Sequence, residues 1–288
     1  MSRQQDLVSV IIPYYNHGAY VLEAIDSILA QTYRNFEIVL VDDGSNDPRS
    51  LEVLAAIDIP EVTIYRKPNG HLSSARNHGI RNSRGEMILT LDADDRFDPS
   101  FLEKAVPILK GDDRLGVVTC HVRRFGSDRG LDGEIWRPKG GDVTNFLVEN
   151  NCCGNSLFRY VCWTDAGGYD EKLRGFEDWD FWLSVTQKKW QVHTIPEVLF
   201  HYRDLPGSLY RITSHNRRQL MTTIVENHLE SYRTHVVYVV SELLRMKEEE
   251  KQALHDKLRD IKRSKAYRIS SRFLNPLSLL GIRIGPYR

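Results

Sequence analysis

The sequence has 288 residues, with 39 Lys and Arg against 39 Asp and Glu, so its formal net charge is zero. This length favours one α/β catalytic domain with an extension, and a neutral chain has no global field to attract nucleic acid. Of the four cysteines two are adjacent and two stand alone, which predicts reduced thiols rather than a disulfide framework or a CxxC zinc site.

The chain starts with polar residues 1–6 and passes directly into a short apolar run at 8–12. That run is far too short for the apolar region of a signal peptide. Because Arg283 and other polar residues interrupt the C-terminal candidate, no stretch reaches the roughly 18 apolar residues of a membrane span. We therefore expect a cytoplasmic protein, either soluble or bound peripherally to the inner face of the membrane.

Short β-branched runs then alternate with helical patterns, which is the rhythm of βαβ units. The runs are almost continuously apolar, as expected of parallel strands covered by helices on both faces. In the helix expected at 20–30, apolar residues recur at three- and four-residue spacing, so one face should pack on the sheet. This part of the chain predicts strands at 8–12, 36–41 and 62–65 and helices at 20–30 and 51–56.

The same rhythm continues toward the middle of the chain. A helix from Ser73 leads to a strand at 87–91, and Pro99 is expected to open the next helix. The segment 127–141 is rich in Gly, Asp and Arg without periodicity, so we expect a loop over the active face. Further strands are predicted at 117–122, 156–159 and 198–202, with a helix beginning near Asp178 and helical segments beyond 215.

These patterns predict an α/β fold with a Rossmann-like, mostly parallel central sheet flanked by helices. We expect the catalytic domain to occupy residues 1–214 and a helical, basic, amphipathic extension to occupy residues 215–288.

Three carboxylates, at Asp92, Asp94 and Asp95, directly follow the strand predicted at 87–91. In open α/β sheets ligands bind outside the carboxyl ends of the strands. Mg²⁺ and Mn²⁺ prefer such oxygen ligands together with substrate phosphates. The cluster indicates a metal–diphosphate site, and the alternative is a solvated acidic turn or a helix cap before Pro99.

Two further polar groups are expected at the same edge of the sheet. Asp42 and Asp43 follow the strand at 36–41, and Asp43 could accept a hydrogen bond from a base N–H or a ribose hydroxyl. The alternative is an Asx-type turn. Tyr15 follows the first strand and could stack on a flat base, whereas aromatic residues near strand ends more often belong to the core.

Arg76 and the acidic pair Glu177 and Asp178 complete the set of candidates. Arg76 could face a phosphate or nucleobase, but a lone helical arginine is usually a solvated charge. A carboxylate beside an apolar neighbour such as Trp179 has its pKa raised, which suits a general base. For Asp178 the alternative is a helix N-cap, since acids are favoured at that end of a helix.

Together these segments resemble the family 2 glycosyltransferases, which have the nucleotide-diphosphosugar transferase fold called GT-A. The similar segments follow the family's order across about residues 7–204. The resemblance rests on residues 8–16, 31–33, 36–45, 75–77 with Gly79, 85–86, 91–95, 167–170 and 177–180.

The resemblance implies a role for each matching residue. Asp178 would be the catalytic base beside Glu177, and Asp94, helped by Asp95, would carry Mn²⁺ or Mg²⁺. The strand end at 201–203 is similar to a family position near the diphosphate, which adds His201 to the expected metal ligands. The nucleotide-sugar site would comprise Pro13, Tyr15, Asp42, Asp43, Arg76, Asp92, Ala93 and Asp94.

The implied activity is transfer of a sugar from a nucleotide-diphosphate donor, by family default a UDP-sugar, to an acceptor hydroxyl with inversion. The expected acceptor is a glycan or a lipid-linked molecule in cell-surface polysaccharide or glycoconjugate synthesis. A non-catalytic sugar-nucleotide binding module is one alternative. A nucleotidyltransferase usually has a glycine-rich basic loop after the first strand, where this chain has residues 13–18, and the GxGxxG motif of NAD-binding domains is absent.

The C-terminal segment 257–288 has nine Lys or Arg residues and one acid, Asp260, interleaved with apolar residues. Such a basic amphipathic tail is typical of contact with anionic membrane surfaces, here near a lipid-linked acceptor. The alternatives are packing against the catalytic domain, or a homodimer through C-terminal helices at 236–261. No nucleic-acid partner is expected.

Overall fold

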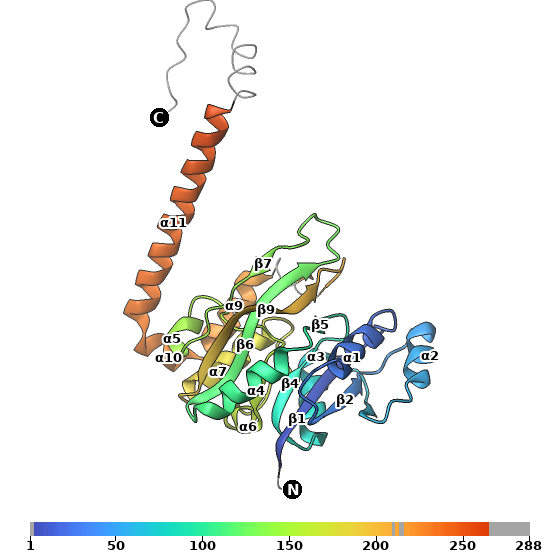
Figure 1. Ribbon diagram of the computed structural model, residues 1–288. Coiled ribbons are helices and arrows are strands. Elements are labelled where there is room, and N and C mark those ends of the chain that lie inside the picture. Colours follow the sequence, from blue (N-terminus) through green and yellow to red (C-terminus); the bar gives the residue numbers. More distant parts are fainter. Residues whose placement is uncertain (1–2, 209–210, 213–215, 265–288) are drawn as a thin grey trace, which may run out of the picture. The chain divides into compact units, whose positions relative to one another are not determined.

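The computed structural model describes residues 3–208, 211–212 and 216–264 (Figure 1). The chain divides into two compact units, one ending at His235 and the other beginning at Val236. The first unit holds the mixed β-sheet and its covering helices, and the second contains the long helix α11 (Val236–Arg263).

The N-terminal half of the first unit is a parallel sheet, because each strand returns through a helix. In spatial order its strands are β3 (Val62–Arg66), β2 (Phe36–Asp42), β1 (Gln4–Tyr14) and β4 (Gly85–Thr90). The connecting helices are α1 (Val21–Leu29), α2 (Pro48–Ala56) and α3 (His71–Asn82). The βαβ units expected from the sequence are thus present with nearly the expected bounds.

Beyond β4 the sheet is mixed. The short strand β8 (Leu157–Arg159) lies antiparallel between β4 and β6 (Leu115–Phe125), while β9 (Gln191–Arg203) runs parallel to β6. The edge strand β5 (Arg96–Phe97) pairs antiparallel with β9, and β7 (Ile135–Trp136) pairs with β6 beside this path. The α/β class is confirmed, and the sheet is parallel mainly in its first half.

Two expected boundaries were wrong. The segment 127–141 is not entirely a loop, because β7 within it pairs with β6. The last strand begins at Gln191 rather than at 198. The register of its pairing with β6 shifts between Ile195 and Val198, because Pro196 has no N–H to donate to the ladder of hydrogen bonds.

Helices close the first unit on both sides of its mixed half. Their bounds are α4 (Phe101–Gly111), α5 (Val143–Phe146), α6 (Tyr160–Ala166), α7 (Glu177–Gln187), α9 (Arg217–Asn227) and α10 (Leu229–Thr234). His228, between α9 and α10, hydrogen-bonds Asp180 and Gln187 of α7 at 2.9 and 2.8 Å. The first unit therefore extends past residue 214, where the sequence pattern placed its end.

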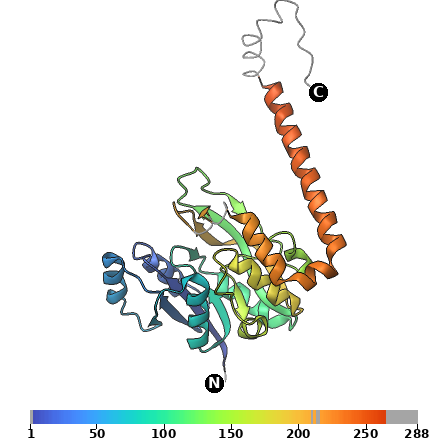
Figure 2. The same cartoon turned by 180° about the vertical axis from the view of Figure 1, so that it is seen from behind.

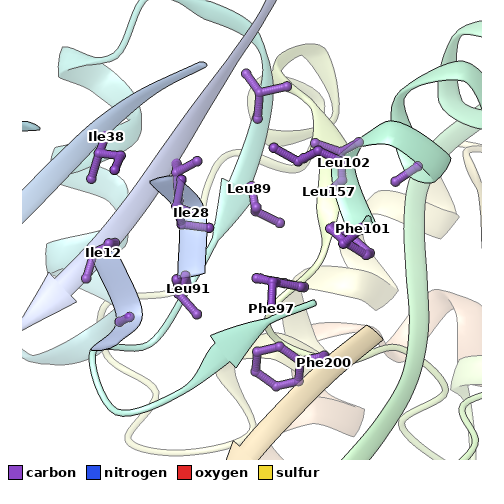
Figure 3. Close-up of a cluster of buried hydrophobic side chains, with 14 of the residues drawn as sticks. Ile12, Ile28, Ile38, Leu89, Leu91, Phe97, Phe101, Leu102, Leu157 and Phe200 are labelled. Atoms are coloured by element: carbon purple, nitrogen blue, oxygen red, sulfur yellow. The ribbon is translucent and has the colours of Figure 1, made fainter. Parts of the chain in front are cut away.

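The core lies between the sheet and helices α1 and α4 (Figure 3). Phe97 stacks on Phe101 with ring centroids 4.4 Å apart and tilts against Phe200 at 4.8 Å. Burial of one such ring contributes about 1.5–3 kcal/mol to folding. Because Phe97 follows the acid cluster by two residues, this packing fixes one end of the acidic loop.

The described part of the second unit consists of α11, which continues without a break in both views of the chain (Figures 1 and 2). Among the described residues, no helix combines the length and apolar character needed to cross a membrane. Most of the basic segment 257–288, from residue 265 onward, lies outside the described residues.

Candidate functional site

The ends of the parallel strands meet at one edge of the sheet, as their order requires. The Asp43 N–H donates to the Tyr14 carbonyl at 2.9 Å, which holds the end of β2 beside the end of β1. On the other side of β1, the Leu91 N–H donates to the Ile11 carbonyl at 3.0 Å. The segments that carry Tyr15, Asp43 and the acid cluster are therefore neighbours at this edge.

Asp43 is buried and holds the start of α3. Its carboxylate accepts the Gly70 N–H at 2.9 and 3.1 Å and pairs with Lys67 Nζ at 2.5 Å. Gly70 is the N-cap residue of α3, where carboxylates are favoured by the unpaired N–H groups. Asp43 therefore positions the helix that carries Arg76, and its expected contact with the nucleoside remains a prediction.

The surroundings of Asp42 and Tyr15 bear on two of the alternatives left by the sequence. The Asp42 carboxylate accepts the Ser45 N–H at 2.9 Å, which is the contact of an Asx-type turn. Tyr15 is 41% exposed, whereas the adjacent Tyr14 is buried and donates its hydroxyl to the Ser50 carbonyl at 2.6 Å. The ring of Tyr15 is thus open to a ligand rather than part of the core.

Arg76 connects two halves of the site. Only 1% exposed, it donates from Nη1 to Glu177 Oε1 at 2.9 Å and from Nη2 to Asp92 Oδ1 at 2.8 Å. Close packing of α3 on β1 permits this reach, since a Cβ at Gly79 would lie 2.5 Å from Ile11 Cγ2. The interpretation of Arg76 as a solvated charge is wrong, and the start of α7 is joined to the end of β4.

Asp178 is the second residue of α7, so it lies within the helix, and Phe176 is the N-cap residue. Its carboxylate accepts the Trp179 N–H at 2.8 Å through Oδ1 and Asn150 Nδ2 at 2.8 Å through Oδ2. Burial raises the pKa of Asp178, and the positive charge of Arg76 offsets part of that rise. A carboxylate with increased proton affinity can accept a proton from a hydroxyl.

Glu177 is buried beside Asp178, the residue expected to be the base. Burial raises the pKa of Glu177 to about 7, while Arg76 acts in the opposite direction. Since its Oε1 already accepts from Arg76, the geometry gives Glu177 the role of holding the arginine near the base.

The acids at 92–95 have different surroundings. Asp95 is fully enclosed and accepts the Arg203 N–H at 2.7 Å, which joins the acidic loop to the end of β9. Burial, with the nearby charges of Asp94 and Asp92, raises the pKa of Asp95 well above its ordinary value. Asp92 binds Arg76. Within the described part of the chain, the Asp94 carboxylate accepts no hydrogen bond from another side chain, so its oxygens are available.

His17 lies near this free carboxylate and was not singled out in the sequence. Burial raises the pKa of Asp94, and the charge of His17 is the strongest effect that lowers it. His17 Nδ1 is buried, and no described residue forms a hydrogen bond with it. A cation or an anionic phosphate bound here would satisfy groups that the protein leaves unpaired.

The three expected metal ligands do not form one cluster. His201 packs its ring edge-on against Phe125 at 6.4 Å, and burial lowers its pKa. Across the residues that the structure describes, no three His, Cys, Asp or Glu side chains are grouped to hold a metal ion. Of the expected ligands, Asp94 has the free oxygens, whereas Asp95 is occupied by Arg203.

One irregular segment between α5 and β8 contacts both the base and the acidic loop. Asn150 binds Asp178, and Asn155 Oδ1 accepts the Asp92 N–H at 2.9 Å. The Asn155 amide also lies 3.4 Å from a carboxylate oxygen of Asp95. The sequence analysis named neither asparagine, because this segment has no helical or strand periodicity.

The comparisons with known proteins identify the family of this chain. The sequence model described as "Glycosyl transferase family 2" matches residues 9–162, which include the strand ends, Arg76, the acidic loop and both asparagines. The chain belongs to glycosyl transferase family 2. The family expected from the sequence is therefore confirmed.

Two relatives show how far the similarity extends. An uncharacterised glycosyltransferase of Rickettsia felis is 48% identical over 222 residues, covering 73% of this chain and 36% of that protein. The chondroitin synthase of Pasteurella multocida is 30% identical over 186 residues, covering 63% of this chain and 19% of that protein. This chain thus spans only about a third of the first relative's length and less of the second.

Solved structures share the fold at low identity. S. aureus TarS 1–349 in complex with UDP-GlcNAc superimposes with a TM-score of 0.61 at 19% identity, covering 76% of this chain and 66% of that one. The mannosyltransferase PcManGT from Pyrobaculum calidifontis, in complex with GDP-Man and Mn²⁺, gives a TM-score of 0.58 at 19% identity. It covers 92% of this chain and 83% of that one, and both confirm the GT-A fold.

Asn150→Ala tests how the base is tuned. A hydrogen bond to an ionised carboxylate favours its charged form, so loss of the Asn150 amide should raise the pKa of Asp178 further. The acidic limb of a kcat/KM profile against pH, for whichever nucleotide sugar the protein turns over, should then move to higher pH. Asn82→Ala, which removes an exposed amide bound to His78, should leave that limb in place. An unchanged limb in Asn150→Ala would exclude Asp178 as the titrating group.

Proposed function

We propose that this protein is an inverting, metal-dependent glycosyltransferase that moves a sugar from a nucleotide-diphosphate donor to an acceptor hydroxyl. The observation that carries the proposal is the Arg76 bridge. Arg76 binds both Glu177, which is adjacent to the proposed base Asp178, and Asp92, which follows β4. These two carboxylates are far apart in the sequence. Family membership supports glycosyl transfer as the chemistry.

In this proposal, the Asp178 carboxylate takes the proton from the acceptor hydroxyl while that oxygen attacks the anomeric carbon. The bond to the nucleoside diphosphate breaks on the opposite side of that carbon, which inverts its configuration. Asn150 holds one oxygen of the base, and Arg76 holds Glu177 beside it. Such general-base assistance typically contributes about 10²–10⁴-fold to the rate.

The residues present fit a divalent cation at Asp94. Its oxygens lack side-chain partners in the described chain, and its raised pKa marks a carboxylate that an added positive charge would stabilise. When bound, Mn²⁺ or Mg²⁺ would stabilise negative charge on the leaving diphosphate. Asp94 would hold the ion, and Tyr15 and Asp43 would contact the nucleoside. His17 and His201 are further candidates near the diphosphate.

Asp94→Asn is expected to weaken Mn²⁺-dependent donor binding while the fold is kept, because the amide preserves the shape and removes the charge. The affinity for a nucleoside diphosphate should fall by at least tenfold, the equivalent of about 1.4 kcal/mol. Calorimetric titration with and without Mn²⁺ measures this change. Equal affinity in the variant and the wild type would remove Asp94 from the site.

The donor can be found with a thermal-shift screen of nucleotide sugars. Ligands that bind the native state raise its melting temperature by mass action, so a true donor should stabilise the protein in Mn²⁺ and lose that effect with chelator. UDP-sugars are tested first, since TarS was solved with UDP-GlcNAc, and GDP-mannose second, since PcManGT was solved with it. If no nucleotide sugar shifts the transition, the proposal fails.

The acceptor is proposed to be a glycan or a lipid-linked molecule of cell-surface polysaccharide synthesis. The similarity to a chondroitin synthase supports a polysaccharide product. Contact of the basic segment 257–288 with the inner membrane face belongs to the same proposal. Flotation with anionic vesicles tests that contact, and equal vesicle binding by the full chain and a chain truncated at Lys257 would refute it.

A further inference from the structure

The helix α11 has an apolar stripe that no described residue of its own unit covers. Eight apolar residues on it are between 51% and 77% exposed, although exposed apolar side chains of this size usually stand singly on a surface. Apart from Val236 and Leu243, which flank the stripe, six of the eight recur along one face of the helix. They are Val237, Val240, Leu244, Leu254, Leu258 and Ile261. This set is named the seam.

The spacing of the seam has the period of a coiled coil. With Lys247 and Lys251 in the two intermediate positions, the residues follow one another in alternating steps of three and four along the whole of α11. A step pattern of this kind averages 3.5 residues, which keeps a narrow stripe facing one partner helix in a left-handed supercoil. Six of the eight core positions in these four heptads are apolar, and a repeat of this length indicates a coiled coil.

The charges of α11 fit the same arrangement. Arg245 pairs with Glu242 and Glu249, and Arg259 pairs with Asp256, all on the face opposite the seam. These charged side chains of the outer face therefore form ion pairs within α11 itself. Beside the seam, Glu248 follows Lys247 and Glu250 precedes Lys251. These are the flanking positions from which a carboxylate reaches a cation on the partner helix.

We propose that α11 forms a two-stranded coiled coil with α11 of a second copy of this chain. The long stems of Lys247 and Lys251 can pack along the seam while their charged ends reach water and the partner's Glu248 and Glu250, which a two-helix assembly permits. A polar residue at a core position is also the usual device that fixes the register and the number of helices.

The seam complements itself in either direction. In a parallel pair each residue meets its own counterpart. In an antiparallel pair centred on residue 249, Val237 meets Ile261, Val240 meets Leu258 and Leu244 meets Leu254. In the antiparallel pair every apolar position is covered by an apolar position and Lys247 meets Lys251, and a surface shaped for an unrelated partner has no reason to provide this apolar match.

An anionic membrane surface suits this helix less well. Residues 236–263 contain seven Lys or Arg and six Asp or Glu, so there is almost no excess positive charge. Three acids in a row, at 248–250, would approach the lipid head groups beside the seam. Helices that bind such surfaces carry a strongly basic polar face.

The test is the mass of the full chain in solution by light scattering on a size-exclusion column. The wild type should elute as a dimer of the 33.3 kDa chain, and Leu254→Glu with Leu258→Glu should elute as a monomer. The matched control, Gln252→Glu with Ala253→Glu, places the same two charges on the outer face of the same turn and should remain dimeric.

Three results would overturn the proposal. One is a wild type that stays monomeric at every protein concentration measured. The second is a seam variant that remains dimeric. The third is a monomeric wild type that floats with anionic vesicles and loses this binding in the seam variant, which would assign the stripe to a membrane. Melting of the sheet domain at an unchanged temperature in both variants shows that neither change acts through the first unit.

Discussion

Asp178→Asn is expected to lower kcat by about 10²–10⁴-fold and to leave donor affinity nearly unchanged. The amide keeps the size of the side chain and can still contact Asn150, but it cannot take a proton from the acceptor hydroxyl. Release of the nucleoside diphosphate from the donor identified in the thermal-shift screen measures the turnover, and calorimetry measures the binding.

The matched control is Asp113→Asn, which neutralises an exposed aspartate in the turn between α4 and β6. This variant should turn over the donor at the wild-type rate. Near-normal transfer by Asp178→Asn would show that another group is the base, whereas a loss of donor affinity equal to the loss of turnover would place Asp178 in the binding site only.

Arg76→Ala is expected to lower the free energy of unfolding by about 3–5 kcal/mol, because it leaves Glu177 and Asp92 as buried or partly buried carboxylates without their cation. The change should appear as a lower midpoint in urea unfolding. Arg76→Lys keeps the charge but cannot make both hydrogen bonds, so its midpoint should fall between those of Arg76→Ala and the wild type.

Arg66→Ala is the control for the loss of an arginine. The Arg66 side chain is 61% exposed and lies 3.9 Å from Asp42, so its removal should cost less than about 1 kcal/mol. Adding Glu177→Gln to Arg76→Ala should recover part of the lost stability, since the unpaired carboxylate is then neutral. If Arg76→Ala and Arg66→Ala unfolded at the same urea concentration, the buried bridge would not stabilise the fold.

The strands and their acids could be predicted because the information is local. A parallel strand buried on both faces must be apolar, so residues 36–41 and 87–91 were recognisable, and the acids that follow them had to lie at one edge. The resemblance to a family then assigned roles to these residues. The position of Arg76 followed from neither spacing nor charge, since its burial depends on partners 16 and 101 residues away.

The segment between α5 and β8 could not be predicted, because its path has no periodicity. It is fixed by tertiary contacts such as Ser156 to Thr119, at 2.9 Å, and Asn155 to the acidic loop. The start of β9 was missed for a different reason. Pro196 interrupts β9, so residues 191–195 do not form one continuous strand pattern with residues 198–202 in the sequence.

The end of the first unit was placed too early because α9 and α10 are helical like α11. The contacts of Asn227 and His228 with Asp180 and Gln187 of α7 show that α9 and α10 belong to the first unit. The sequence predicted C-terminal helices at 236–261, whereas the seam of α11 and its exposure required the structure.

The most direct test of the shared site is a calorimetric titration of UDP and GDP into the wild type, Asp94→Asn and Asp178→Asn, each with Mn²⁺ or with chelator. We expect one of the nucleotides to bind the wild type and Asp178→Asn with Mn²⁺ only, and to bind Asp94→Asn at least tenfold more weakly. Binding that ignores both the metal and Asp94, or no binding of either nucleotide, would contradict a nucleotide-sugar site at this edge of the sheet.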